Sequence, residues 1–393
     1  MRKFIAAALL LGLLITAAGC KAQKKPAATT NSSTQPTTVT VPVDVKPINQ
    51  IPMVAISMPV VSENTTAQDN TVVFTNTYQN MQLITNDPEV ADKVIIDYLN
   101  QTEKFSAAAA TQKQAEDAYN QKPSAVSWVP YLSQITYAPT RIDQGVLSLF
   151  GNHINYTGGA HGNMVGHSLN YDLLSGKRLS LSEIFTPSVN PAYISTLVLN
   201  ALSTHEGLFP DYKETVNSRF SSNMLQDDDW YLTNTGLCFF FSPYEIASFA
   251  AGTISAEIPY NALIGTLKDE YFPAEREQAG GSVEIAPFDE KIAENYSQFA
   301  ELVLKENAKK ILLFSNDGVY DIRLETGSWS ADGKTFTPEH TVFASYALTP
   351  GDALMVDAAF DEKLPVLRLS YTTGGKTVQY FIQANGSYSL SPA

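Results

Sequence analysis

Three histidines in one stretch of the chain are its first candidate for chemistry. His153, His161 and His167 could gather a metal ion if strand alternation placed them on one side, because imidazole is a common metal ligand. A histidine that fixes a turn by hydrogen bonds is the commoner arrangement, and His161 stands in such a setting. The sequence therefore predicts no metal site at these residues.

The setting of His161 is a glycine-rich run, Tyr156-Thr157-Gly158-Gly159-Ala160-His161-Gly162-Asn163. Glycine tolerates positive φ and close backbone approach, so the run predicts a tight turn that presents His161 at or near a surface. This turn is the first candidate for a binding or structural role. Its candidate residues are Tyr156, Gly158, Gly159, His161, Gly162 and Asn163.

Two catalytic motifs are begun and not completed. A nucleophile elbow needs Gly-x-Ser-x-Gly, but Gly166-His167-Ser168-Leu169 is followed by Asn170. A zinc-protease helix needs His-Glu-x-x-His, but His205-Glu206-Gly207-Leu208 is followed by Phe209. We therefore predict no catalytic residue, no cofactor and no enzymatic activity.

Other reactive side chains have structural interpretations. Asp227-Asp228-Asp229 lacks the ligand offsets and glycine turn of a calcium loop, which favours a solvated loop. Cys238 stands in an apolar run, which is typical of a buried, inert thiol. Tyr244 and Glu245 follow Pro243, where a strand is expected to end. They either pack two units of the chain together or line a groove.

Two runs carry a resemblance to a known family. One is the glycine run at 156–163, and the other extends from Gly236 to Gly252 and closes in Ile258-Pro259-Tyr260. Together, over roughly residues 70–272, they resemble the paired domains of unknown function in the extracellular part of the lysozyme-binding anti-sigma factor RsiV. The same pair resembles the N-terminal, non-catalytic part of the deacetylase PdaC. The resemblance implies a place at the bacterial cell envelope and supplies no reaction. A zinc polysaccharide deacetylase needs a paired-aspartate motif and two histidines four residues apart, which this chain lacks.

The N-terminus reads as an export signal. Arg2 and Lys3 precede an apolar run, and small residues lead to Cys20. The ending Ala-Ala-Gly-Cys resembles a bacterial lipoprotein box, so residues 1–19 are predicted to be a signal peptide and Cys20 to carry lipid. The alternative is ordinary cleavage and a freely secreted protein. Lipidation would hold the protein outside the cytoplasm on a membrane, at the cell envelope.

Charge restricts the classes of partner. The chain carries a formal net charge of −14, and removal of residues 1–19 takes away two basic residues and makes it −16. An acidic body argues against nucleic acid, which selects a basic face. It suits a cationic protein such as a lysozyme, whose association would be steered by charge.

Hydrophobic periodicity predicts an α+β fold in successive units. Residues 20–50 are rich in Thr, Ser and Pro and read as a lipid-anchored disordered tether. The first unit, 51–172, combines a strand near Val72, helices behind Asp87-Pro88-Glu89 and at 107–122, and strands at 133–137, 146–150 and 167–173. The second unit, 173–279, combines a helix capped by Asn190-Pro191 with strands at 231–232, 237–241 and 253–258.

The third unit, 280–393, belongs to no family that we recognise. Ile292, Tyr296, Phe299 and Val303 stand in helical register, which predicts a helix from Asp289 to Lys310. Short strands bounded by turn dipeptides follow and predict a small β-sandwich or barrel-like sheet. They lie at 320–324, 341–346, 354–358, 366–371 and 378–382.

These features favour a binding or sensing module of the cell envelope. The expected partner is a lysozyme-like or other cationic wall-associated protein. The alternative is an enzyme that acts on cell-wall polysaccharide, or an accessory protein that binds cell-wall glycan.

Overall fold

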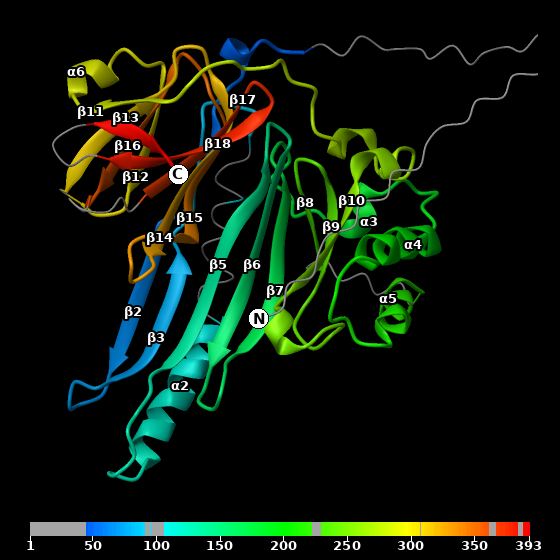
Figure 1. Ribbon diagram of the computed structural model, residues 1–393, viewed down its shortest axis with the longest axis vertical. Coiled ribbons are helices and arrows are strands. Elements are labelled where there is room, and N and C mark those ends of the chain that lie inside the picture. Colours follow the sequence, from blue (N-terminus) through cyan, green and yellow to red (C-terminus); the bar gives the residue numbers. More distant parts are fainter. Residues whose placement is uncertain are drawn as a thin grey trace, which may run out of the picture. The chain divides into compact units, whose positions relative to one another are not determined.

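The computed structural model describes residues 45–90, 95, 106–221, 229–306, 308–360, 367–383 and 388–393. The strands in these ranges form four sheets, three of them drawn with the helices that cover them in Figure 1. The predicted α+β class is confirmed. The predicted signal peptide, Cys20, most of the tether and nearly all of the helix expected behind Asp87 lie outside the described residues.

A five-stranded sheet forms the first unit, in the order β2-β3-β5-β6-β7. All its pairs are antiparallel except β3 with β5. Helix α2 (Ser106–Gln121) packs against β3, and Ala115 is buried there against Val73 and Phe74. The predicted strands and the helix at 107–122 are confirmed. The strands are β2 (Val60–Thr66), β3 (Val72–Gln79), β5 (Tyr131–Ile142), β6 (Val146–Tyr156) and β7 (Asn163–Asp172).

The second unit packs helices on a three-stranded sheet in the order β10-β9-β8. Helix α4 (Pro191–Leu202) begins as predicted, because the Asn190 side chain accepts a hydrogen bond from the Ala192 amide. The helices α3 (Leu181–Ile184) and α5 (Tyr212–Ser221) were not predicted. The strands are β8 (Trp230–Leu232), β9 (Gly236–Phe241) and β10 (Ile254–Pro259).

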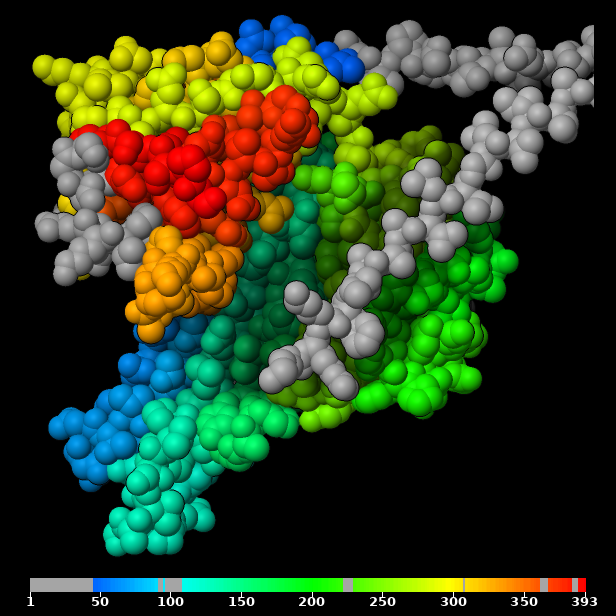
Figure 2. Space-filling model, in the orientation of Figure 1, coloured from blue at the N-terminus to red at the C-terminus, as the bar shows by residue number. Residues whose placement is uncertain are grey.

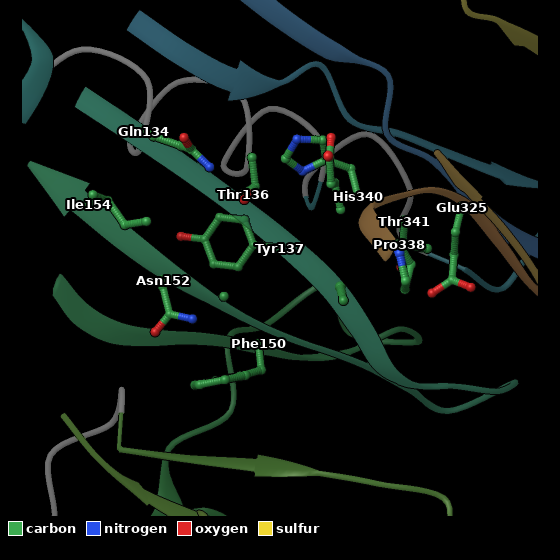
Figure 3. Close-up of a pocket in the computed structure, with 13 residues that line it drawn as sticks. Gln134, Thr136, Tyr137, Phe150, Asn152, Ile154, Glu325, Pro338, His340 and Thr341 are labelled. Carbon is green, nitrogen blue, oxygen red and sulfur yellow. The ribbon is translucent and has the colours of Figure 1, made fainter. Parts of the chain in front are cut away.

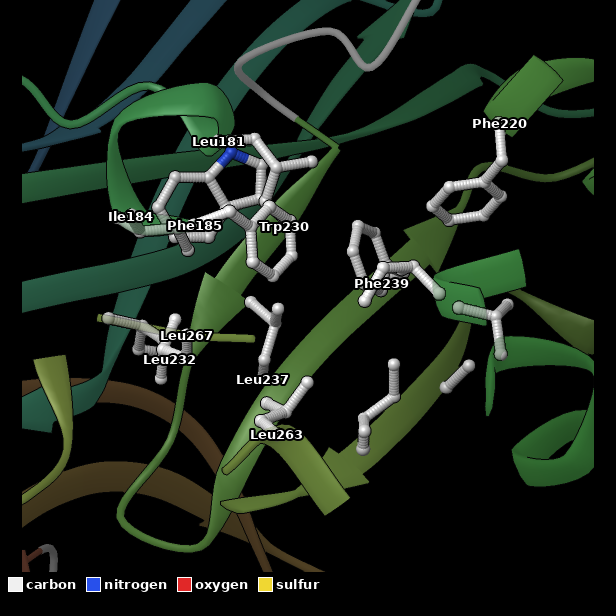
Figure 4. Packing of buried hydrophobic residues seen from close by; sticks show 14 of the residues in the cluster. Leu181, Ile184, Phe185, Phe220, Trp230, Leu232, Leu237, Phe239, Leu263 and Leu267 are labelled. Carbon is white, nitrogen blue, oxygen red and sulfur yellow. The ribbon is translucent and has the colours of Figure 1, made fainter. Parts of the chain in front are cut away.

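The core of the second unit is apolar and aromatic. Trp230, Leu237 and Phe239 project from the sheet and lie among the side chains of Phe185 and Phe220 (Figure 4). Burial of a side chain of this size contributes about 1.5–3 kcal/mol. This core holds the three-stranded sheet that ends in the candidate loop after β9.

The C-terminal part consists of two sheets that share one core. The larger has the order β19-β18-β17-β14-β15-β1-β4, and the smaller has the order β11-β13-β16-β12. The predicted β-rich unit is confirmed. Its own strands are β11 (Glu284–Pro287), β12 (Gln298–Val303), β13 (Lys309–Phe314), β14 (Val319–Trp329), β15 (Phe336–Leu348), β16 (Asp352–Ala358), β17 (Leu367–Thr373), β18 (Lys376–Gln383) and β19 (Ser389–Pro392).

The helix predicted from Asp289 to Lys310 is wrong. Only α6 (Glu290–Ala293) is helical, and β12 and the start of β13 occupy the rest. Ala300 and Leu302 are buried in β12 while Glu301 is exposed, which is the alternation of a strand. Pairing of β12 with β16 therefore overrode the helical spacing of the apolar residues.

Two N-terminal strands complete the larger C-terminal sheet. Strand β1 (Val54–Ser57) lies between β15 and β4 (Gln82–Thr85), antiparallel to both. All four residues of β1 are buried. The predicted division into 51–172, 173–279 and 280–393 does not include this pairing, which joins the first segment to the last.

A buried ion pair fastens the first sheet to the second unit. The guanidinium of Arg141, at the end of β5, lies 2.6 Å from the Asp143 carboxylate. It also donates to the Tyr260 hydroxyl at 2.8 Å and to the Tyr271 carbonyl at 2.5 Å. Among the described helices, none combines the length and apolar character that crossing a bilayer requires.

Candidate functional site

The glycine run forms the turn between β6 and β7. Gly158 and Gly159 have φ of +97° and +96°, which explains why glycine is needed at both positions. The Tyr156 hydroxyl donates to the Gly159 carbonyl at 3.2 Å, and His161 Nδ1 donates to the Gly162 carbonyl at 2.9 Å. His161 is exposed and contributes a hydrogen bond to the turn, as the sequence predicts.

The second candidate run forms a loop, residues 242–252, after β9. Tyr244 adopts φ of +72° although it is not glycine, and its side chain is 59% exposed. The loop holds this conformation through two hydrogen bonds. The Tyr244 amide donates to the Ala247 carbonyl at 2.9 Å, and the Ser242 amide donates to the Glu245 carboxylate at 2.8 Å. A bulky residue in this backbone region is an outlier and points to a functional constraint.

The structure brings the turn and the loop together. The His161 ring stacks on the Phe249 ring, with centroids 4.1 Å apart and planes at 22°. The Tyr244 ring lies 5.8 Å from the Phe249 ring. We call His161, Tyr244 and Phe249 the aromatic patch. The Gly166 amide also donates to the Ser242 hydroxyl at 3.0 Å, which ties the start of the loop to β7.

Phe249 is the member of the patch that the sequence analysis missed. It lies inside the run from Gly236 to Gly252, but its role depends on a contact with a residue about ninety positions earlier. Asn163, by contrast, begins β7 and pairs with Asn155 in the sheet. Its place in the candidate set therefore follows from the turn and not from the patch.

Charged groups surround the base of the loop. Arg219 of α5 pairs with Asp229, donates to the Phe240 carbonyl at 3.0 Å and lies over the Phe241 ring at 4.8 Å. The side chain of Glu245 is exposed, yet the atoms around its carboxylate desolvate it and raise its pKa, while Arg219 acts in the opposite direction. Glu245 thus places a carboxylate beside the exposed ring of Tyr244.

The histidines do not converge. His167 Nδ1 shares a hydrogen bond of 2.7 Å with the Tyr137 hydroxyl, and His153 Nε2 lies 3.3 Å from the Ser133 hydroxyl. In the ranges that the structure describes, no group of three or more His, Cys, Asp or Glu side chains is placed to hold a metal ion.

The other reactive side chains are buried. Ser168 lies in strand β7 without exposure, and its hydroxyl donates to the Trp230 carbonyl at 2.5 Å. Its position in a strand differs from the strained turn that a nucleophile elbow requires. Cys238 is buried in β9, and burial raises the pKa of its thiol to about 12. A thiol with such a pKa carries almost no thiolate near neutral pH, as expected for an inert cysteine.

Two family models match adjacent parts of the chain. Residues 49–164 match the model described as Deacetylase PdaC, and residues 182–261 match the model described as Protein of unknown function (DUF3298). The predicted resemblance to this paired module is thereby confirmed, while the likeness to RsiV itself stays a prediction. The glycine turn lies in the first matched region, and loop 242–252 lies in the second.

Two solved structures are similar to part of the chain. A member of the DUF3298 family from Bacteroides fragilis is 19% identical, with a TM-score of 0.40, over 57% of this chain and 96% of that one. A DUF3298 family protein from Pseudomonas aeruginosa is 17% identical, with a TM-score of 0.38, over 56% of this chain and 97% of that one. No curated protein matches the chain.

Proposed function

We propose that the protein is a binding module of the bacterial cell envelope, lipid-anchored through Cys20, that binds a cationic wall-associated protein such as a lysozyme. The observation that carries this proposal is the exposed Tyr244, held with φ of +72° beside the stacked rings of His161 and Phe249. The paired family models and the acidic chain support it.

Backbone strain at Tyr244 favours a binding role. A left-handed conformation costs a non-glycine residue about 1–2 kcal/mol. Such a cost persists where the surrounding structure imposes it, often at sites of recognition. Here the strain keeps a large aromatic ring in solvent instead of in the core. Tyrosine is also among the side chains that dominate binding energy at protein interfaces.

Charge favours a cationic partner. The chain has a net charge of −14, and the Glu245 carboxylate lies next to Tyr244 in the loop. A lysine or arginine of the partner could lie over the tyrosine ring and near this carboxylate, which combines a cation–π contact with an ion pair. Long-range attraction would raise the association rate and would weaken as salt increases.

The proposal is tested by calorimetry and surface plasmon resonance with a panel of purified lysozymes. Cytochrome c serves as a cationic protein without wall-cutting activity. Tyr244→Ala is expected to weaken lysozyme binding about tenfold or more, which corresponds to about 1.4 kcal/mol. Tyr193→Ala is the matched control, since Tyr193 is a 43% exposed tyrosine on α4.

Three outcomes contradict the proposal. One is the absence of binding to every lysozyme, and another is equal binding of cytochrome c, which would reduce the interaction to charge alone. The third is an equal loss from Tyr244→Ala and Tyr193→Ala. An association rate that does not change between low and high salt removes the electrostatic part.

A further inference from the structure

A cavity of about 420 Å³ lies between the five-stranded sheet and the hairpin of β14 and β15. Gln134 and Asn152 line it from β5 and β6, while Glu325 and His340 line it from β14 and β15 (Figure 3). In Figure 2 the hairpin, in orange, lies beside the blue and teal strands of the five-stranded sheet. The cavity is separate in the fold from the aromatic patch, and none of the patch residues lines it.

A buried glutamine holds the two walls in a fixed relation. Gln79, in the last position of β3, accepts a hydrogen bond from the Tyr137 amide at 2.7 Å. Its Nε2 donates to the carbonyls of Tyr137 and Thr341, both at 3.0 Å. Tyr137 and Thr341 line the cavity from opposite walls. Because one side chain bonds to both, the walls are already ordered, and little conformational freedom would be lost when a ligand binds.

The lining offers hydrogen bonds of several kinds. Gln134 and Asn152 carry amides, which both donate and accept. The Asn152 carbonyl oxygen accepts from the Thr253 hydroxyl at 2.9 Å, which fixes the orientation of the amide. His340 Nδ1 is buried with no hydrogen-bond partner among the described residues. A buried polar atom without a partner is unfavourable, and a ligand group placed there would satisfy it.

The charges of the lining are mostly compensated. Arg368 donates to the Glu325 carboxylate through Nε at 2.9 Å and Nη2 at 2.8 Å, which neutralises it. Glu339 accepts from the Ser328 hydroxyl at 2.6 Å and is exposed. Burial lowers the pKa of His340, which keeps its imidazole neutral near pH 7. The cavity therefore presents dense hydrogen-bonding groups with little net charge, and what charge remains is negative.

We propose that this cavity binds one or two units of a neutral saccharide, of the hexose or N-acetylhexosamine class. Paired amides and a carboxylate oxygen suit vicinal hydroxyls, which donate and accept at adjacent positions. The Tyr137 and Phe150 side chains supply apolar surface for the ring carbons. The volume lies within the range of about 300–1,000 Å³ that is usual for small-molecule sites. Anions would meet Glu325 and Glu339 with no free cation opposite.

The experiment titrates the purified full chain with N-acetylglucosamine, its β-1,4-linked trimer and glucose, followed by calorimetry and ligand-observed NMR. Sulfate and spermidine are the anionic and cationic comparison ligands. Saturable binding of at least one sugar is expected, together with no saturable binding of sulfate or spermidine. Gln134→Leu and His340→Gln are expected to weaken sugar binding about tenfold each. The matched controls are Gln114→Leu and His205→Gln, which change exposed side chains and should leave binding unchanged.

Gln79→Met tests the positioning role, because Gln79 holds the walls and is expected to weaken binding without any contact to the sugar. Circular dichroism establishes that each variant is folded, and Gln134→Leu carries the test if Gln79→Met unfolds. Binding of spermidine or sulfate in place of sugars overturns the proposal. So does the absence of saturable sugar binding, or sugar binding that Gln134→Leu and His340→Gln leave intact. Tyr244→Ala should preserve sugar binding, so failure at this cavity is distinguishable from failure at the aromatic patch.

Discussion

Replacement of Arg141 by methionine should destabilise the protein by about 3–5 kcal/mol, the range measured when one member of a buried ion pair is removed. The Arg141 side chain is 2% exposed and bonds to Asp143, Tyr260 and Tyr271. Methionine fills much of the volume but leaves the Asp143 carboxylate without its cation. The Tyr260 hydroxyl and the Tyr271 carbonyl also lose a donor, so the link between the first sheet and the second unit weakens.

The double variant Arg141→Met/Asp143→Asn isolates the charge. Asp143 also accepts from the amides of Gly145 and Val146 at 2.8 and 2.7 Å. An asparagine carbonyl oxygen can keep these two bonds while it removes the unpaired charge, so the double variant should recover part of the loss. Lys113→Met is the control, because the Lys113–Asp117 pair is exposed, and such pairs contribute about 0.3–0.5 kcal/mol.

The assay is urea denaturation followed by far-ultraviolet circular dichroism, with the midpoint of each variant compared with that of the parent. The reasoning is refuted if Arg141→Met shifts the midpoint no more than Lys113→Met does. It is also refuted if the double variant is less stable than Arg141→Met, because the unpaired carboxylate would then not be the source of the loss.

Three further predictions concern single residues. Gly159→Ala should lower stability by about 1 kcal/mol in a thermal melt because φ is +96°, whereas Gly280→Ala, at an open position without positive φ, should change it little; equal effects would contradict the strain argument. Cys238 should react with Ellman's reagent only after unfolding, because its thiol is buried and its pKa is raised to about 12; rapid labelling of folded protein would contradict this. Cys20→Ala should release the protein from membranes or leave it unprocessed, and unchanged membrane fractionation of the variant would exclude the lipid anchor.

The elements with a complete local pattern could be predicted from the sequence. Helix α4 has a capping asparagine, a proline in its first turn and one apolar face, and all three features appear in the structure. The turn before β14 contains Asp317-Gly318, and Gly318 has φ of +78°. In each case the signal lies within a few residues of the element that it determines.

Elements that depend on distant pairing could not be predicted. The apolar residues of 289–310 fit a helix and a strand about equally well, and only the pairing of β12 with β16 decides between them. Strand β1 is buried along its whole length and shows no alternation of polar and apolar residues. Its partner β15 lies almost three hundred residues away, which no local pattern indicates.

The candidate site shows the same division. The glycine turn and the loop after β9 were both identified from residue types, because positive φ and exposed aromatic residues leave a local signature. The stacking of His161 on Phe249 is a long-range contact that arises from the packing of two sheets. The cavity beneath His340 also joins distant segments, and the sequence analysis contains no sign of it.

The C-terminal sheets complete the fold of the matched module. The PdaC model begins at residue 49, so the matched region includes β1 and β4. Both strands pair into the sheet that β14, β15 and β17 build from the far end of the chain. Without those strands β1 would lose its neighbour β15 and expose apolar surface, because Val54, Ala55 and Ile56 are fully buried. Residues 280–393 therefore supply one wall of the cavity and part of the support for the first sheet, and both proposed sites depend on a chain folded to its end.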